Sequence, residues 1–394
     1  MDDLEFRAWH RLAHTPGLSR SAARALLVAC GSARAAAQLG ADEVQALAGA
    51  RAAAAWRAAA SARDAARLLA ACRWREGARR HVLALGEPDY PELLLHAPDP
   101  PLLLYVQGDA ALLRGSAADS ACLAVVGSRQ PTPAGRAHAR AFAQAFARAG
   151  LTVVSGLAIG VDAAAHEGAL EGGGPTVAVT GTGPDLVYPT RHRVLAERIA
   201  EHGAIVTEYP PGTPSRAEHF PQRNRIIAGL TRGTLVVEAA LQSGSLITAR
   251  LAAESGREVF AVPGSIDSPQ SRGCHALIRQ GALLVEQPQE VLAEIGWDSD
   301  QARTGAPGAS QRAAPPQAEG PVAPPADADD VSGPDTRTTR ALLQALGYEP
   351  VDLDTLAART GLPGAELAAR LLELELDGRV SRMPGGLFQR CGRA

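Results

Sequence analysis

The sequence predicts an α/β protein built on a doubly wound, Rossmann-type parallel sheet. Between residues 121 and 296, short runs of continuous apolar residues alternate with stretches of helical periodicity. Such runs are typical of strands that are buried on both faces, and the helices between them are typical of parallel crossovers. Nearly every run ends in glycine or a polar residue. Since ligands of these sheets bind beyond the carboxyl ends of the strands, we expect the functional site along that edge.

The individual elements follow from the same pattern. The expected strands are 122–127, 151–156, 176–181, 204–208, 234–239, 258–264 and 282–286. The expected helices are 133–149, 162–171, 190–202, 222–230, 245–255 and 273–280.

Residues 1–78 are expected to form a separate helical domain. Apolar residues recur there at helical spacing, and the Ala-rich residues 50–70 predict one long helix ending near Gly77. The turn Pro16-Gly17 before a helix from about Ser19 resembles a helix-hairpin-helix or SAM-like domain, whose backbone N–H groups can face a phosphate. A small helical bundle without a ligand is the alternative.

Three further segments complete the domain organisation. Residues 79–120 are expected to be an approach segment whose two strands, 81–85 and 102–106, extend the edge of the sheet. Residues 297–335 contain mostly Ala, Pro, Gly, Ser and Asp, which predicts a disordered linker. Residues 336–394 predict a winged helix, with three helices and a hairpin. Its third helix is acidic, which favours a protein-contact or accessory role over duplex DNA readout.

Composition narrows the function classes. The net charge of −3 gives no global basic field, and the basic residues are all arginine, whose planar guanidinium suits phosphates. The five cysteines are scattered without a CxxC pair, so we expect neither a zinc site nor disulfides. No signal peptide or membrane span is visible, which predicts a cytoplasmic protein. The first strand is not followed by GxGxxG, so no dinucleotide cofactor is expected.

The turn Gly127-Ser128-Arg129 joins a buried strand to a helix that begins near Pro133. Backbone N–H groups and the helix dipole at such a turn favour an anion, and Arg129 offers several further donors. An ordinary turn with a solvated arginine is the alternative.

A second glycine-rich turn spans residues 155–170. Gly156 and Gly160 allow close approach of a ligand, Asp162 occupies an expected N-cap, and His166 follows one turn later. A catalytic Asp–His pair is conceivable, but no nucleophile accompanies it at a matching spacing. We therefore favour a capping aspartate and a packing histidine.

The stretch 219–230 has the composition of a single-strand binding site. Phe220 is expected in an extended segment before Pro221, with Arg223 and Asn224 on the opening turn of a helix. An aromatic ring can stack on a base while guanidinium groups contact phosphates. Arg191 and Arg216 could extend the cationic rim. A core phenylalanine with ion-paired arginines is the alternative.

Another anion-suited helix start is Ser243-Gly244-Ser245. Glu238 precedes it at the end of a strand. This carboxylate could act as a base, or it could pair with an arginine across the cleft, and we favour the ion pair.

In this order, these motifs resemble the DNA-processing protein A (DprA/Smf) family of bacterial recombination mediators. The resemblance implies a non-enzymatic homodimer, joined through the Rossmann-type domains, that binds single-stranded DNA and loads the RecA recombinase during natural transformation. It places the DNA contacts at Gly127, Ser128, Arg129, Phe220, Arg223 and Asn224, with support from Arg191 and Arg216. Two departures affect the rim: the chain has no lysine there, and Glu218 lies close to Arg216.

An enzyme remains the competing prediction. A glycine-rich helix start after a strand-ending glutamate is similar to the nucleoside monophosphate phosphoribohydrolases of the lysine-decarboxylase-like family. Glu238 would then be the acid or the nucleophile, although the PGGxGT signature of that family is absent.

Overall fold

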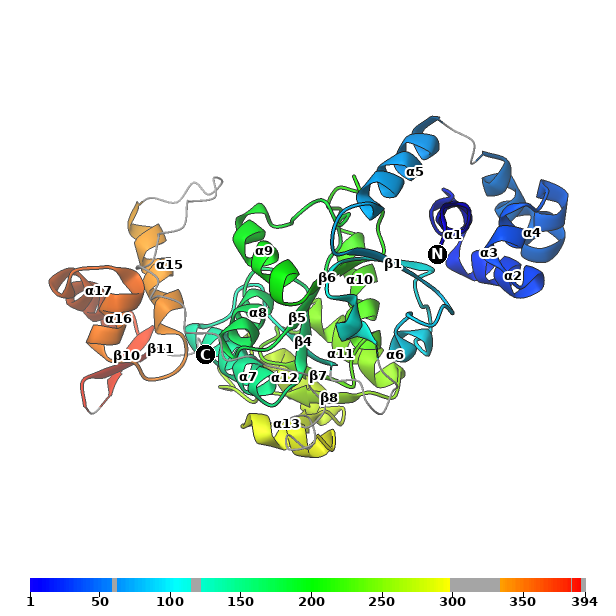
Figure 1. The fold of residues 1–394 in the computed structure, drawn as a ribbon. Coiled ribbons are helices and arrows are strands. Elements are labelled where there is room, and N and C mark those ends of the chain that lie inside the picture. Colours follow the sequence, from blue (N-terminus) through cyan, green and yellow to red (C-terminus); the bar gives the residue numbers. More distant parts are fainter. Residues whose placement is uncertain (59–61, 115–121, 298–333, 384, 391–394) are drawn as a thin grey trace. The chain divides into compact units, whose positions relative to one another are not determined.

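The computed structural model describes residues 1–58, 62–114, 122–297, 334–383 and 385–390 (Figure 1). The chain divides into two compact units, 1–297 and 298–394. The finer domain boundaries expected at residues 78, 120, 296 and 335 stay predictions, and the predicted linker lies almost entirely outside the described residues.

The described residues of the first unit form a nine-stranded sheet, which confirms the predicted fold class. The strand order is β1-β2-β6-β5-β4-β3-β7-β8-β9, parallel from β6 to β9, with β1 and β2 added antiparallel at one edge. The strands are β1 Arg80–Ala84, β2 Leu103–Gly108, β3 Cys122–Val126, β4 Thr152–Ser155, β5 Thr176–Val179, β6 Ala204–Thr207, β7 Gly233–Val236, β8 Glu258–Ala261 and β9 Leu283–Leu284.

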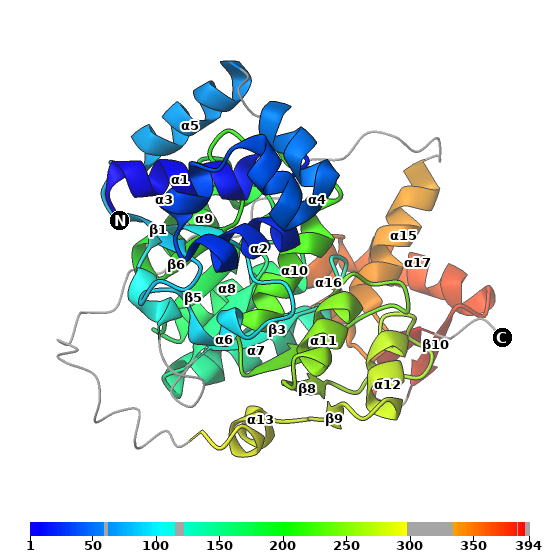
Figure 2. The same ribbon diagram turned by 90° about the vertical axis from the view of Figure 1, so that its right-hand side faces the viewer.

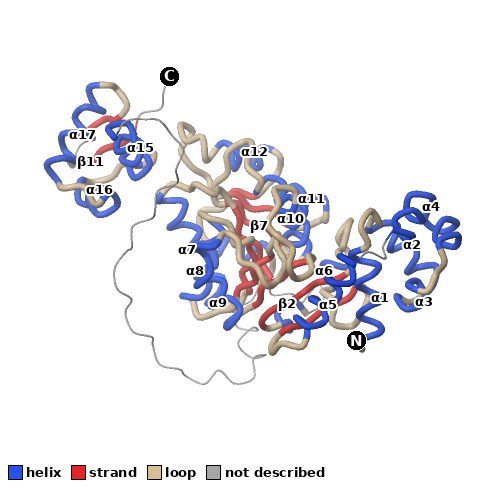
Figure 3. The backbone as a smooth tube through the Cα atoms, turned by 90° about the horizontal axis from the view of Figure 1, so that it is seen from above, coloured by secondary structure: helices blue, strands red, loops and turns tan. Residues whose placement is uncertain are grey.

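Helices cover both faces of this sheet, as Figure 3 shows. One face packs against α7, α8, α9 and α13, and the other against α6, α10, α11 and α12. Their bounds are α6 Glu92–Leu95, α7 Pro133–Arg148, α8 Val161–Glu171, α9 Arg193–His202, α10 His219–Gly229, α11 Ser245–Glu254, α12 Arg272–Arg279 and α13 Pro288–Glu294, with short 3-10 helices at Ala110–Leu113 and Thr190–His192.

The order of the strands reverses between β3 and β7. From β3 the chain adds β4, β5 and β6 on one side, and then returns to place β7, β8 and β9 on the other. At such a switch point the connections leave in opposite directions and open a crevice beyond the carboxyl ends of the two central strands. The segments that follow β3 and β7 are those in which the sequence predicts anion-binding turns.

The N-terminal helices pack against the antiparallel edge of the sheet. They are α1 Asp3–His14, α2 Arg20–Cys30, α3 Ala33–Ala37, α4 Ala41–Ala58 and α5 Ala62–Arg75. Phe6 and Trp74 enclose the ring of Tyr105 on β2. Ser19 caps α2, which begins at Arg20, one residue from the predicted start. The long helix predicted for 50–70 corresponds to the end of α4 and the start of α5, and residues 59–61 between them lie outside the described part.

The second unit has the expected winged-helix arrangement. Its helices are α15 Pro334–Leu346, α16 Leu353–Thr360 and α17 Gly364–Leu376, followed by the hairpin β10 Val380–Met383 and β11 Leu387–Arg390. Gly361 ends α16 in the left-handed conformation, at φ 69°, which glycine adopts without strain. Among all described residues, no helix is both long and apolar enough to cross a membrane.

Two histidines on α1, the buried His10 and the partly exposed His14, are expected to make the first unit sensitive to acid. Burial lowers the pKa of His10 to about 4, and burial also lowers the pKa of His14 well below its usual value. Between pH 6.5 and about 4, the unfolded chain therefore binds a proton that folded His10 does not bind. We expect the melting temperature to fall as the pH is lowered through this window, and to fall less in His10→Phe.

The phenylalanine substitution is a fair test because Nε2 of His10 has no hydrogen-bond partner to lose. His138→Phe, at an exposed position on α7, serves as the control. Thermal unfolding followed by circular dichroism at a series of pH values gives the comparison. Equal pH dependence in wild type and His10→Phe would contradict the assignment.

Candidate nucleic-acid interface

A cleft of about 780 Å³ opens at the switch point between β3 and β7. It lies between the segment after β3, the start of α10 and the start of α11. Figure 2 shows α10 and α11 side by side at this edge. Of the predicted site residues, all except Gly156 and Arg191 line the cleft: Gly127, Ser128, Arg129, Arg216, Phe220, Arg223, Asn224, Ser243, Gly244 and Ser245.

The turn after β3 is held in place from beneath. Ser128 donates its backbone N–H to the carbonyl oxygen of Glu238 at 2.6 Å, and its hydroxyl accepts from the N–H of Gln130 at 3.0 Å. A Cβ on Gly127 would come within 2.8 Å of that same carbonyl oxygen, so this close approach requires glycine. Ser128 is buried and shapes the turn, whereas Arg129 projects into solvent at the cleft.

Phe220 lies on the first turn of α10, and the predicted extended conformation is wrong. The helix begins at His219 rather than at residue 222. Pro221 does not prevent this, because N–H groups in the first turn have no partner within the helix and proline loses nothing there. The consequence is that the ring of Phe220 is presented by a rigid helix.

Phe220 stands in a row with a cation and a second aromatic ring. The guanidinium carbon of Arg129 lies 5.4 Å from the centre of the Phe220 ring. The Phe220 ring also contacts the ring of Tyr188, with 5.5 Å between the two centroids. Tyr188 is 48% exposed. Tyr188 was not among the predicted site residues. An aromatic residue directly before Pro189, in a loop that follows a glycine-rich strand end, was the available signal.

Arg223 forms part of the floor of the cleft. Only 4% of it is exposed, one nitrogen donates to the carbonyl oxygen of Val179, and another lies 3.8 Å from the carboxylate of Asp162. A Cβ on Gly156 would collide with this guanidinium, so Gly156 acts beneath the cleft by leaving space. Burial lowers the pKa of Arg223, and burial raises the pKa of Asp162 against the opposing effect of Arg223.

The Asp162–His166 pair has structural contacts. Gly160 occupies the N-cap of α8, so the placement of Asp162 at the cap was wrong by two residues. His166 is fully buried, accepts from the N–H of Leu157 at 3.3 Å and bonds the hydroxyl of Thr176 at 2.7 Å. Burial lowers the pKa of His166 to about 3, so this ring is neutral near pH 7. These contacts agree with the packing role that we favoured.

The start of α11 forms the opposite wall. Asn224 donates from Nδ2 to the carbonyl oxygen of Gly244 at 3.1 Å, which ties α10 to this helix start. The hydroxyls of Ser243 and Ser245 lie 2.7 Å apart. Because α11 begins at Ser245, the positive end of its dipole lies at the cleft. The N–H groups of Leu246 and Ile247 already donate to the carbonyl oxygens of Ser243 and Gly244, so the dipole and the two hydroxyls are what this helix start offers to an anion.

The cationic rim is weaker than the sequence suggested. Arg216 lines the cleft but lies 3.6 Å from the carboxylate of Glu218, which competes with any phosphate. Arg191 is exposed on the 3-10 helix before α9 and does not line the cleft. Glu238 does not line it either. Its carboxylate accepts from the N–H of Thr132 at 2.8 Å and from the Thr132 hydroxyl at 2.5 Å. Its predicted ion pair with an arginine stays a prediction.

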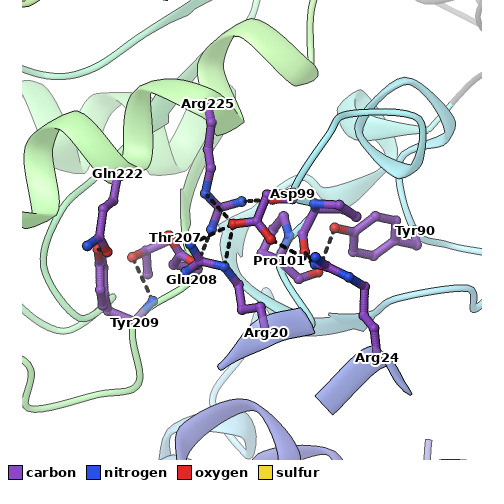
Figure 4. Close-up of polar contacts among 11 residues, drawn as sticks. Arg20, Arg24, Tyr90, Asp99, Pro101, Thr207, Glu208, Tyr209, Gln222 and Arg225 are labelled. Carbon is purple, nitrogen blue, oxygen red and sulfur yellow. Dashed lines mark hydrogen bonds and ion pairs between the residues drawn. The ribbon is translucent and has the colours of Figure 1, made fainter. Parts of the chain in front are cut away.

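A partly buried ionic network, drawn in Figure 4, holds α10 in place. Arg225 pairs with the carboxylate of Glu208 at the end of β6 and donates to the carbonyl oxygen of Asp99. From α2, Arg20 reaches both carboxylates, at 2.6 Å from Asp99 and 3.3 Å from Glu208, and Arg24 lies 2.8 Å from Asp99. The network therefore joins the N-terminal helices to the helix that carries Phe220.

Comparison with known proteins identifies the family. The profile of DNA recombination-mediator protein A matches residues 81–296, and that of the DprA winged helix domain matches 315–386. Protein Smf of Escherichia coli (strain K12) is 42% identical over 322 residues, 82% of this chain and 80% of that protein. DNA processing protein DprA of Streptococcus pneumoniae is 47% identical over 206 residues, 52% of this chain and 71% of that protein. The X-ray structure of DprA from Streptococcus pneumoniae has a TM-score of 0.64 at 37% identity and covers 75% of this chain and 98% of that one. The chain belongs to the DprA/Smf family of DNA recombination-mediator proteins.

Proposed function

We propose that the cleft between β3 and β7 binds single-stranded DNA. The observation that carries this proposal is the row of Arg129, Phe220 and Tyr188 at the cleft, opposite the start of α11. Unpaired bases can stack on the two rings, and the guanidinium can contact a phosphate, which the positive end of the α11 dipole also favours. Paired bases in a duplex are stacked on one another, so they do not offer their faces to these rings.

The wider proposal is that the protein is a recombination mediator that loads the RecA recombinase onto bound DNA. It would act in the cytoplasm, during natural transformation, as a homodimer joined through the Rossmann-type domains. Family membership supports this role. Sedimentation velocity tests the dimer. Strand-exchange assays, with RecA added to DNA already covered by a single-strand binding protein, test the loading.

Arg129→Ala is expected to weaken single-strand binding and to reduce its dependence on salt. Each lost phosphate contact lowers the slope of log K against log salt by about one. Fluorescence anisotropy of labelled single-stranded and duplex oligonucleotides at several salt concentrations measures both quantities.

Arg191→Ala is the matched control, since this arginine is also exposed but lies outside the cleft. Equal losses in the two variants would indicate general charge attraction rather than a site. Equal affinity of wild type for duplex and single strand would contradict the proposal.

The nucleotide hydrolase alternative is less well supported. Its proposed catalytic carboxylate, Glu238, is engaged by Thr132 and lies outside the cleft lining. Incubating the protein with AMP or CMP tests this alternative directly, because a released base would show that the protein is not solely a binder.

A further inference from the structure

The third helix of the winged-helix unit, α17, has two apolar faces. Leu367, Leu371 and Leu374 point into the core of the unit. On the other side Leu372 and Leu376 are 56% and 81% exposed. One or two exposed leucines are ordinary on a protein surface. The spacing of the exposed residues along α17, however, requires an explanation.

The exposed residues form a continuous stripe at the spacing of a helix–helix seam. Ala365, Ala369, Leu372 and Leu376 are all exposed and follow one another at intervals of four, three and four residues. This is the spacing of the a and d positions of a heptad, which pack against a neighbouring helix. At the N-terminal end of the stripe, Ala365 and Ala369 let the backbone of a partner helix approach closely. At its C-terminal end, the side chains of Leu372 and Leu376 can insert between the side chains of that helix.

Acidic residues border this stripe on both sides. With 3.6 residues per turn, Glu366, Glu373 and Asp377 lie along one side and Glu375 along the other. Arg370 lies 3.6 Å from Glu373 and offsets only part of this charge. Glu366, Glu373 and Asp377 are exposed. The surface is therefore an apolar seam with a negative border.

We propose that this face of α17, the α17 stripe, is a docking site for a basic amphipathic helix of a partner protein. Such a helix buries its own apolar residues along the seam and places arginine or lysine opposite the carboxylates. The charges argue against the other occupants. Phosphates of DNA and anionic lipid head groups would be repelled, and a second copy of α17 would set carboxylates against carboxylates. The proposal is independent of the single-strand site.

The test uses the full chain and two labelled peptides of about three heptads, with leucine at a and d. One peptide carries arginine at e and g, and the other carries glutamate there. We expect the basic peptide to bind and the acidic one not to bind. Leu372→Ser together with Leu376→Ser should weaken the basic peptide by about tenfold or more, because two apolar anchors are lost.

Two further variants make the test specific. Leu283→Ser together with Leu284→Ser, two leucines on β9 that are 42% and 46% exposed, should leave peptide binding unchanged. Glu373→Arg together with Glu375→Arg should reverse the preference, so that the acidic peptide binds better than the basic one. This reversal requires a folded α17, so misfolding cannot produce it.

Three results would overturn the proposal. One is equal binding of the basic peptide to wild type and to the Leu372/Leu376 variant, and another is the absence of binding to wild type. The third is a change in oligomeric state, measured by sedimentation velocity, when the two leucines are replaced. That result would assign the α17 stripe to contact between copies of this chain.

Discussion

Replacing Arg225 with alanine is expected to lower the free energy of unfolding of the first unit by about 3 kcal/mol, the low end of the range for breaking a buried ion pair. The side chains of Arg225 and Glu208 are only 13% and 9% exposed. Removing the arginine leaves a buried carboxylate without its main partner. The loss stays at the low end because Arg20 remains 3.3 Å from Glu208. Chemical denaturation followed by circular dichroism measures the change.

Arg24→Ala is the matched control within the same network. The side chain of Asp99, its partner, is 35% exposed and keeps Arg20 at 2.6 Å, so we expect a loss of less than about 1 kcal/mol.

A second variant, Arg225→Met with Glu208→Gln, removes both charges of the buried pair while keeping much of the volume. It should be more stable than Arg225→Ala. If it is not, the uncompensated carboxylate of Glu208 is not the source of the loss in Arg225→Ala.

This network also explains why the N-terminal helices belong to the same compact unit as the sheet. The sequence suggested a separate domain at 1–78, because helical periodicity changes to strands near residue 80. Arg20 and Arg24 gave no sign of their partners, since Asp99 and Glu208 are 75 or more residues away along the chain. Contacts of this kind depend on the assembled fold and have no local pattern.

The sheet, in contrast, was predictable strand by strand. Each parallel strand from β3 to β7 is buried along its whole length, so its sequence is mostly apolar and its polar residues are small, such as Ser155 and Thr176. The short helices α6 and α13 were not predicted. Helix α6 follows a proline directly and has only four residues, too few to show a helical period.

The candidate site was predictable at its glycines and cations but not in its geometry. Gly127 and the Ser243-Gly244-Ser245 segment could be placed because strand ends and helix starts have local signals. Whether an arginine is exposed depends on the segments of the fold that pack over it. Arg129 and Arg223 look alike in the sequence, yet Arg129 reaches solvent while Arg223 is buried beside Asp162.

Phe220→Ala is expected to weaken single-strand binding by about 1–3 kcal/mol, the usual effect of removing one base-stacking aromatic residue. The slope of log K against log salt should stay the same, because the ring contacts no phosphate. This combination separates the role of Phe220 from that of Arg129, whose loss changes the slope. Anisotropy titrations at several salt concentrations resolve the two effects.

Two further substitutions of Phe220 decide whether its contribution to binding comes from stacking on a base. Phe220→Trp keeps a flat aromatic face and should retain most of the affinity, whereas Phe220→Leu keeps an apolar side chain but loses the face and should resemble alanine. If leucine binds as well as phenylalanine, Phe220 supports the cleft by packing. Arg129 lies 5.4 Å over the same ring, so the double variant Arg129→Ala with Phe220→Ala should lose less than the sum of the single losses. Strict additivity would mean that the cation and the ring contact the DNA independently.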